Sequence, residues 1–70
     1  MFIKTSETPH NQIASTRKSA DLTQAQLAEL VGVTRQTIIA IEKGNYTPSV
    51  LLALKLSRAL KQPVGELFWL

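Results

Sequence analysis

The chain has 70 residues, no cysteine and a formal net charge of +3 at pH 7. A chain of this length forms one small domain with a thin core, and the lack of cysteine excludes a disulfide framework and a thiolate metal site. No apolar run approaches the roughly 20 residues that span a bilayer. The sequence therefore predicts a cytoplasmic globular domain with no membrane partner. Its modest positive charge does not by itself establish that the binding partner is anionic.

Residues 1–10 are expected to form an extension ahead of a domain that covers residues 11–70. The segment FIKT near the start alternates apolar and polar side chains, which is a weak strand signal. Thr8 followed by Pro9 predicts an N-cap and the first residue of a helix that runs to about Ala20. Three side chains of this helix are expected to face inward, namely Ile13, Ala14 and Arg17.

Two short helices are predicted at about residues 24–31 and 35–43, joined by a tight turn at Gly32. Glycine suits this turn because a left-handed backbone costs it nothing. So short a turn leaves the second helix standing out from the domain, and a helix with a cationic and amide-bearing face fits the major groove of DNA. The outward face of this helix carries Arg35, Gln36, Ile39, Ala40 and Lys43.

Capping residues support both of these helices. Thr23, with Gln26 three residues later, has the spacing of a capping box. Thr34 is placed to cap the second helix and Gly44 to end it. Ala28 is small where the two helices must approach closely. The apolar side chains that this pair must bury are Leu27, Ala28, Val31, Val33, Ile38 and Ile41.

A fourth helix is predicted from Val50 to about Leu60, with Ser49 as its N-cap. Pro63 opens a short last helix, which runs from Val64 to about Phe68. Because caps and apolar periodicity agree along the whole chain, the sequence predicts an all-α fold of five helices. The residues expected on the inward face of the fourth helix are Val50, Ala53, Leu56 and Leu60.

The segment from Leu22 to Leu60, LTQAQLAELVGVTRQTIIAIEKGNYTPSVLLALKLSRAL, resembles the Xre/Cro/CI family of helix-turn-helix regulators. The turn glycine, the IEKG segment and the PS flank stand at the family's positions, and the likeness covers about Asn11 to Phe68. The resemblance implies a compact five-helix, lambda-repressor-like DNA-binding domain, with short terminal strands as an option. Its partner would be double-stranded DNA, read by the third helix and usually bound by a two-fold dimer at a palindromic operator.

Contacts with DNA bases are expected from Arg35, Gln36, Ile39 and Ala40. The resemblance places Arg35 and Gln36 at the start of the DNA-reading helix, whereas Ile39 and Ala40 depart from the family, in which many relatives carry a polar residue at the position of Ile39. Arginine can bond guanine O6 and N7 together, glutamine can do likewise with adenine, and an exposed isoleucine can press against a thymine methyl. The alternative for Arg35 and Gln36 is a solvated helix start. The alternative for Ile39 is sideways packing against Tyr46 or its loop.

Contacts with the DNA backbone are expected from Gln24, Thr34, Lys43, Asn45 and Tyr46. The Gln24 amide and the free backbone N–H groups at the start of its helix suit a phosphate. A capping or surface role is the alternative for Gln24 and Thr34. Lys43 could instead be simply solvated, and Tyr46 could instead anchor its loop.

In the family, an inward arginine of the first helix pairs with the glutamate of the IE(x)G segment, and both are present here as Arg17 and Glu42. The resemblance therefore implies a partly buried ion pair that ties the first helix to the end of the third. The chain departs from the family pattern at Asp21, where glycine is frequent, at Thr16, where leucine is frequent, and at Pro63 and Gly65, which predict a short last helix. None of these three departures lies on the outward face of the third helix.

Apolar side chains at the chain ends and on the fourth helix predict a homodimer, since two-fold dimers are the commonest assembly. In this interpretation the first and last segments pair as short strands. The alternatives are that Phe2, Ile3 and Trp69 cover the core of their own chain, or that Leu70 is the cut end of a longer regulator. The predicted dimer contacts are Leu51, Phe68, Trp69 and Leu70.

No enzyme is predicted, because His10 is the sole histidine and the five acidic residues are scattered. The sequence likewise predicts no cofactor, no metal site and no small-molecule ligand. Two hypotheses remain: a transcriptional repressor that occupies an operator, and a protein-interaction module such as an antitoxin or adaptor. The basic and amide-bearing face of the third helix favours DNA over a protein partner.

Overall fold

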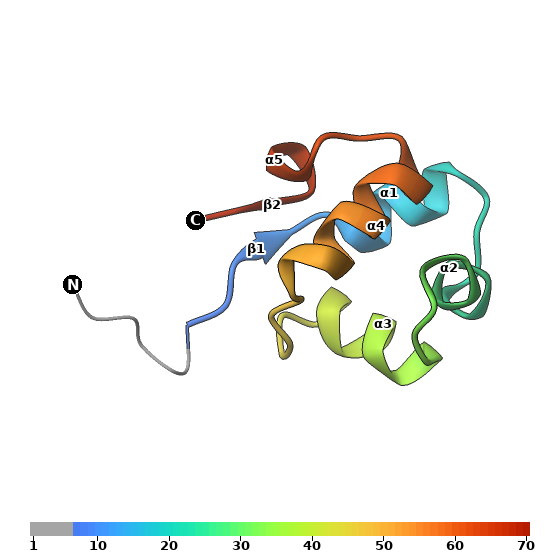
Figure 1. Ribbon diagram of the computed structural model, residues 1–70, viewed down its shortest axis with the longest axis horizontal. Coiled ribbons are helices and arrows are strands. Elements are labelled where there is room, and N and C mark those ends of the chain that lie inside the picture. The colour runs from blue at the N-terminus through green and yellow to red at the C-terminus, as the bar shows by residue number, and fades with distance from the viewer. Residues whose placement is uncertain (1–6) are drawn as a thin grey trace.

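The computed structural model describes residues 7–70, which form five helices and a two-stranded antiparallel sheet (Figure 1). The predicted all-α fold with short terminal strands is confirmed. Every helix in the described part of the chain is too short or too polar to cross a bilayer. In chain order the elements are β1 (His10–Asn11), α1 (Ile13–Ser19), α2 (Gln24–Val31), α3 (Arg35–Glu42), α4 (Val50–Leu60), α5 (Val64–Leu67) and β2 (Phe68–Trp69).

The helices enclose one aliphatic core. Helix α2 contacts both α3 and α4, and α1 contacts α3. Figure 1 shows α3 along the lower edge of the domain, with α4 and α1 above it. The small sheet and α5 lie together to the left of these helices. This arrangement leaves one side of α3 at the surface. The core consists of Ile13, Leu27, Ala28, Val31, Ile38, Ile41, Leu52, Leu56, Leu60 and Leu67.

The predicted ends of α2 and the predicted N-cap of α3 are confirmed. The Thr23 hydroxyl accepts from the N–H of Gln26 at 3.0 Å, and the Gln26 side chain accepts from the N–H of Thr23 at 2.8 Å, which completes a capping box. Gly32 takes a left-handed conformation with φ 75°. Thr34 then caps α3 by accepting from the N–H of Thr37. These local bonds set where the two helices meet.

Two further helix ends also use a left-handed residue, but without glycine. Asp21 follows α1 with φ 58°, and Lys61 follows α4 with φ 57°. Asp21 therefore adopts the backbone that glycine would adopt at this family position, and the N–H of Leu22 bonds to the carbonyl of Arg17 at 3.2 Å. The departure from the family pattern leaves the turn after α1 intact.

The first helix begins at Ile13, so the prediction that Thr8 caps it and Pro9 opens it is wrong. Thr8 instead donates its hydroxyl to the carbonyl of Gly44 at 2.7 Å. The next residues form β1, in which His10 pairs with Trp69 and Asn11 with Phe68. The contacts of this segment with the end of α3 and the end of the chain replace the predicted first turn. The predicted strand signal in FIKT and the predicted role of Met1–Ile3 lie outside the described residues.

The inward face of α4 differs from the prediction at its first residue. Val50 is 78% exposed, and Leu52 takes its place in the core. The two positions point to opposite sides because two residues correspond to about 200° of helix rotation. The buried face is set by the four-residue spacing of Leu52, Leu56 and Leu60. Val33, also predicted to be buried, packs on the edge of the core and is partly exposed.

Candidate nucleic-acid interface

Helices α2 and α3, joined at Gly32, present one side of α3 to solvent. Ile38 and Ile41 are buried and fix the inner side of α3. On its outer side, Arg35 and Gln36 are exposed at the first turn. The outer side therefore begins with a guanidinium and an amide, both of which can make paired hydrogen bonds to base edges.

The other predicted base-contact residues, Ile39 and Ala40, are half-buried. They lie on the same helix, between the exposed first turn and the exposed Lys43 that follows its last residue. Two apolar side chains with a partly free surface suit contact with a thymine methyl.

The segment after α3 is held in one conformation. Gly44 has φ 77°, its N–H bonds to the carbonyl of Ile41 at 3.0 Å, and the N–H of Asn45 bonds to the carbonyl of Ala40 at 2.9 Å. This pair of bonds is a Schellman ending. The predicted backbone-contact residues Asn45 and Tyr46 are exposed directly after it.

The N-terminal segment also supports the end of α3. Thr8 bonds to the carbonyl of Gly44, and the Asn11 amide donates to the carbonyl of Ile41 at 2.9 Å. The sequence predicted Thr8 as a helix N-cap and gave no role to Asn11; the two residues lie 36 and 30 positions away from their partners. No local pattern could have linked them.

Arg17 and Glu42 face each other as the family resemblance implies. Arg17 Nε lies 2.7 Å from Glu42 Oε2, and Arg17 Nη2 donates to Glu42 Oε1 at 3.3 Å. Arg17 Nη1 donates to the carbonyl of Leu22 at 2.8 Å. The guanidinium thus joins α1, the loop before α2 and the last residue of α3.

The predicted phosphate-contact residues Gln24 and Thr34 both have partners within the chain. Gln24 Nε2 donates to Glu42 Oε1 at 3.0 Å, a bond that the sequence did not predict. The Thr34 hydroxyl accepts from the N–H of Thr37 and lies 3.2 Å from the Thr37 hydroxyl. Both side chains are therefore oriented by the fold, at the first residue of α2 and at the N-cap of α3.

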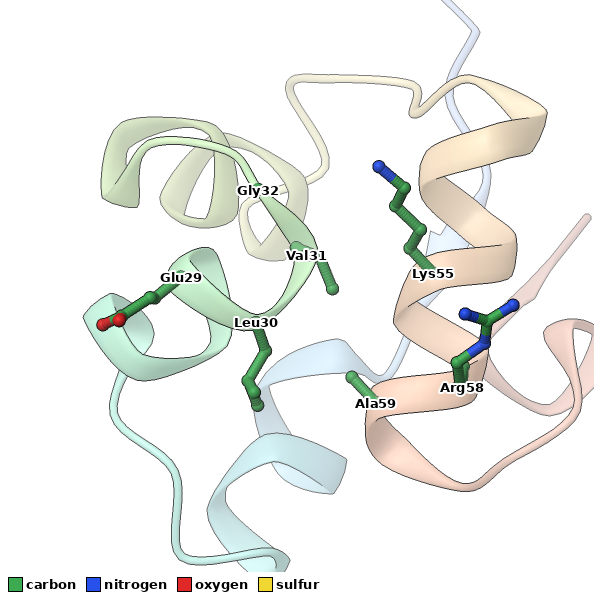
Figure 2. A pocket seen from close by; sticks show the side chains of 7 residues that line it. All are labelled: Glu29, Leu30, Val31, Gly32, Lys55, Arg58 and Ala59. Carbon is green, nitrogen blue, oxygen red and sulfur yellow. The ribbon is translucent and has the colours of Figure 1, made fainter.

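A surface hollow of about 390 Å³ lies between the end of α2 and the outer side of α4 (Figure 2). In Figure 2 the Glu29 carboxylate points away from Lys55 and Arg58, so the hollow does not bring an acid and a base together. Across residues 7–70, no three His, Asp or Glu side chains are grouped to hold a metal ion. The hollow is lined by Glu29, Leu30, Val31, Gly32, Lys55, Arg58 and Ala59.

Comparison with solved structures identifies a protein that has the same fold. The crystal structure of the restriction-modification controller protein C.AhdI from Aeromonas hydrophila superposes on this chain with a TM-score of 0.74. The two sequences are 34% identical, and the match covers 80% of this chain and 85% of the controller protein.

Comparison with known sequences identifies the family. The HTH-type transcriptional regulator YgzD of Bacillus subtilis is 48% identical over 60 residues, which are 86% of this chain and 91% of YgzD. An HTH-type transcriptional regulator of Methanothermobacter thermautotrophicus is 57% identical over 53 residues, 74% of this chain and 77% of that protein. The helix-turn-helix family HTH_3 matches residues 13–67. The chain therefore belongs to this Xre-like helix-turn-helix family, which is a family of DNA-binding transcriptional regulators and not a class of enzymes.

Proposed function

We propose that the protein is a cytoplasmic repressor that binds a palindromic operator as a homodimer, with α3 of each subunit in the major groove. The observation that carries this proposal is the division of α3 into two sides. Ile38 and Ile41 are locked in the core, while Arg35 and Gln36 are free at the surface. A helix held in this way can enter a groove about 12 Å wide without losing its own packing.

Arg35 and Gln36 are the proposed readers of base identity. Arg35 would bond guanine O6 and N7, and Gln36 would bond adenine N6 and N7. Ile39 and Ala40 would add apolar contact with thymine methyl groups further along the same helix. This reading surface, made of Arg35, Gln36, Ile39 and Ala40, then has polar side chains at the first turn of α3 and apolar side chains in its middle.

The proposed contacts with the sugar-phosphate backbone flank this reading surface on both sides. Gln24 at the start of α2 and Thr34 at the N-cap of α3 lie before it. Lys43, Asn45 and Tyr46 follow it and are exposed. Such contacts fix the orientation of a protein on the duplex without selecting sequence.

The homodimer is supported by apolar side chains that the single chain leaves exposed. Leu51 is 62% exposed, and Trp69 and Leu70 are exposed at the end of the chain. Phe68 packs against the core of its own chain, so it offers less surface to a partner. A two-fold axis would place the two α3 helices in major grooves about 34 Å apart.

Selection of duplexes from a random pool, followed by binding measurements at two salt concentrations, tests the proposal. We expect a palindromic site and an affinity that falls steeply with salt, because bound phosphates release counterions. Absence of binding at low salt would overturn the DNA function. The alternative, a protein-interaction module, would then become the better explanation of the exposed apolar residues.

Arg35→Ala is expected to weaken binding to the selected site by about 1–3 kcal/mol and to relax preference at one base pair. Arg58→Ala is the matched control, since Arg58 is equally charged but lies on α4 beside the hollow. Fluorescence anisotropy with the selected site and with single-base variants of it measures both effects. Equal losses for the two variants would contradict the placement of the reading surface on α3.

A further inference from the structure

The carboxylate of Glu42 accepts hydrogen bonds from side chains of two other helices. Arg17 of α1 donates twice to it, and Gln24 of α2 donates Nε2 to its Oε1 at 3.0 Å. Glu42 itself is the last residue of α3. One buried carboxylate therefore joins the start of α2 to the end of α3 and to α1.

Burial alone does not require the bond to Gln24. The Glu42 and Arg17 side chains are 8% and 10% exposed and satisfy each other through two contacts. Gln24 is only half-buried, so water could satisfy its amide. The bond instead has an effect on orientation, since it holds a long side chain that would otherwise be free at the helix start.

We propose that Glu42 is a positioning residue that holds the Gln24 amide ready for a DNA phosphate. This inference rests on the proposed DNA function. An amide nitrogen carries two N–H groups, and the bond to Glu42 uses one of them. The other N–H is then available for a phosphate oxygen, as is typical of polar side chains at a helix start.

Arg17 makes this arrangement compatible with DNA. An isolated carboxylate close to a phosphate would repel it, but the charge of Glu42 is balanced by the guanidinium at 2.7 Å. The same guanidinium holds the carbonyl of Leu22, two residues before Gln24. The backbone that leads into α2 and the side chain of its first residue are thus fixed by the same buried pair.

The arrangement also couples the phosphate contact to the reading helix. Because Glu42 belongs to α3, a phosphate held by Gln24 sets where α3 lies in the groove. Pre-ordering this side chain lowers the entropy cost of binding, which is the general benefit of preorganisation. The contribution of Gln24 to affinity should therefore depend on Glu42.

A double-mutant design tests this dependence. Replacing both members of a buried ion pair by apolar residues is often tolerated, so Arg17→Leu with Glu42→Leu removes the acceptor while keeping a filled core. In the natural background we expect Gln24→Ala to weaken duplex binding about three- to tenfold, the usual worth of one hydrogen bond. In the double-leucine background we expect the same change to cost less than about twofold.

Gln36→Ala is the matched control, because Gln36 is an amide on α3 for which the structure shows no bond to Glu42. Its loss should be equal in both backgrounds. Normal duplex binding with equal losses for Gln24→Ala in both backgrounds would overturn the positioning role alone. If the unmodified chain does not bind duplex DNA, the proposed DNA function itself is overturned.

A measurement on the unmodified chain keeps the inference falsifiable if the double variant does not fold. Nitrogen-15 relaxation of side-chain amides reports motion on the picosecond to nanosecond scale. We expect the Gln24 amide to be restrained in the free protein and the Gln36 amide to be mobile. Equal mobility of the two amides would overturn the inference.

Discussion

Arg17 shows how one residue can be stabilising only through its partner. Its side chain is almost completely buried, and Glu42 balances its charge. A buried pair of this kind is not automatically more stable than an apolar pair, but the removal of one member leaves a buried charge without compensation. The contribution of the pair is therefore to position three segments, at the risk of a large loss when it is broken.

Glu42→Ala is expected to lower the free energy of unfolding by roughly 3–5 kcal/mol, because Arg17 then stays buried without a counter-charge. Urea denaturation followed by circular dichroism measures this change. Glu29→Ala is the control, since Glu29 is an exposed carboxylate on α2 and its removal should change stability by less than about 0.5 kcal/mol. An unchanged unfolding midpoint for Glu42→Ala would contradict the role assigned to the pair.

Ala28 is a second residue whose size matters. It is buried on α2, in the core that α2 shares with α3 and α4. Ala28→Leu is expected to cost about 1–3 kcal/mol, because added methylenes must push packed neighbours apart. Ala25→Leu makes the same change at an exposed position of α2 and should cost little. Thermal denaturation of the two variants separates overpacking from any general effect of leucine on this helix.

At the scale of elements, helices α1 to α4 are each followed by a residue in the left-handed conformation. Gly32 and Gly44 supply the left-handed residue after α2 and α3, whereas Asp21 and Lys61 supply it after α1 and α4. Glycine adopts this backbone freely, and other residues pay about 1–2 kcal/mol for it. Helices α2 and α3 therefore end without backbone strain, whereas α1 and α4 end at a residue whose backbone is strained.

Lys61→Gly is accordingly expected to raise the free energy of unfolding by about 1 kcal/mol, because it relieves the left-handed strain after α4. For a domain of this size the melting temperature should rise by roughly 4–8 °C. Lys55→Gly, inside the same helix, is the control and should have the opposite sign, with a loss of about 1 kcal/mol. A fall in melting temperature for both variants would contradict the strain at position 61.

At the scale of the whole molecule, the N-terminal segment links two distant parts of the domain. Thr8 and Asn11 bond to carbonyls at the end of α3, while β1 pairs with β2 (Figure 1). The N–H of Gln12 also bonds to the carbonyl of Leu67 at 3.0 Å. The strand β2, which carries the exposed Trp69, is thereby connected through β1 to the segment that bonds to the end of α3.

The proposed homodimer gives a prediction at this scale. Leu51→Lys is expected to shift the protein from dimer to monomer without lowering the stability of the fold, because Leu51 is exposed in the single chain. Sedimentation equilibrium measures the shift. Leu30→Lys makes the same change at a residue of nearly equal exposure, 61%, on α2, and it should leave the assembly unchanged. A dimer that survives Leu51→Lys would place the interface elsewhere.

Local sequence determined most of the motif formed by α2, the turn at Gly32 and α3. The bounds of α2 and the starts of α3 and α4 follow from Thr23, Gly32, Thr34 and Ser49, because caps and left-handed turns act within a few residues of their own position. The family resemblance added the pairing of Arg17 with Glu42, which spans 25 positions and which no local pattern contains.

Only the tertiary structure decided how the ends and faces of these helices are used. Thr8 and Pro9 have the composition of a helix start, but contacts with the end of α3 and with β2 draw that segment into an extended form. The apolar residues of α4 fit more than one inward face, and packing against α2 and α5 buries Leu52 and leaves Val50 exposed. In both cases the outcome depends on contacts between segments far apart in the chain, which no local sequence pattern contains.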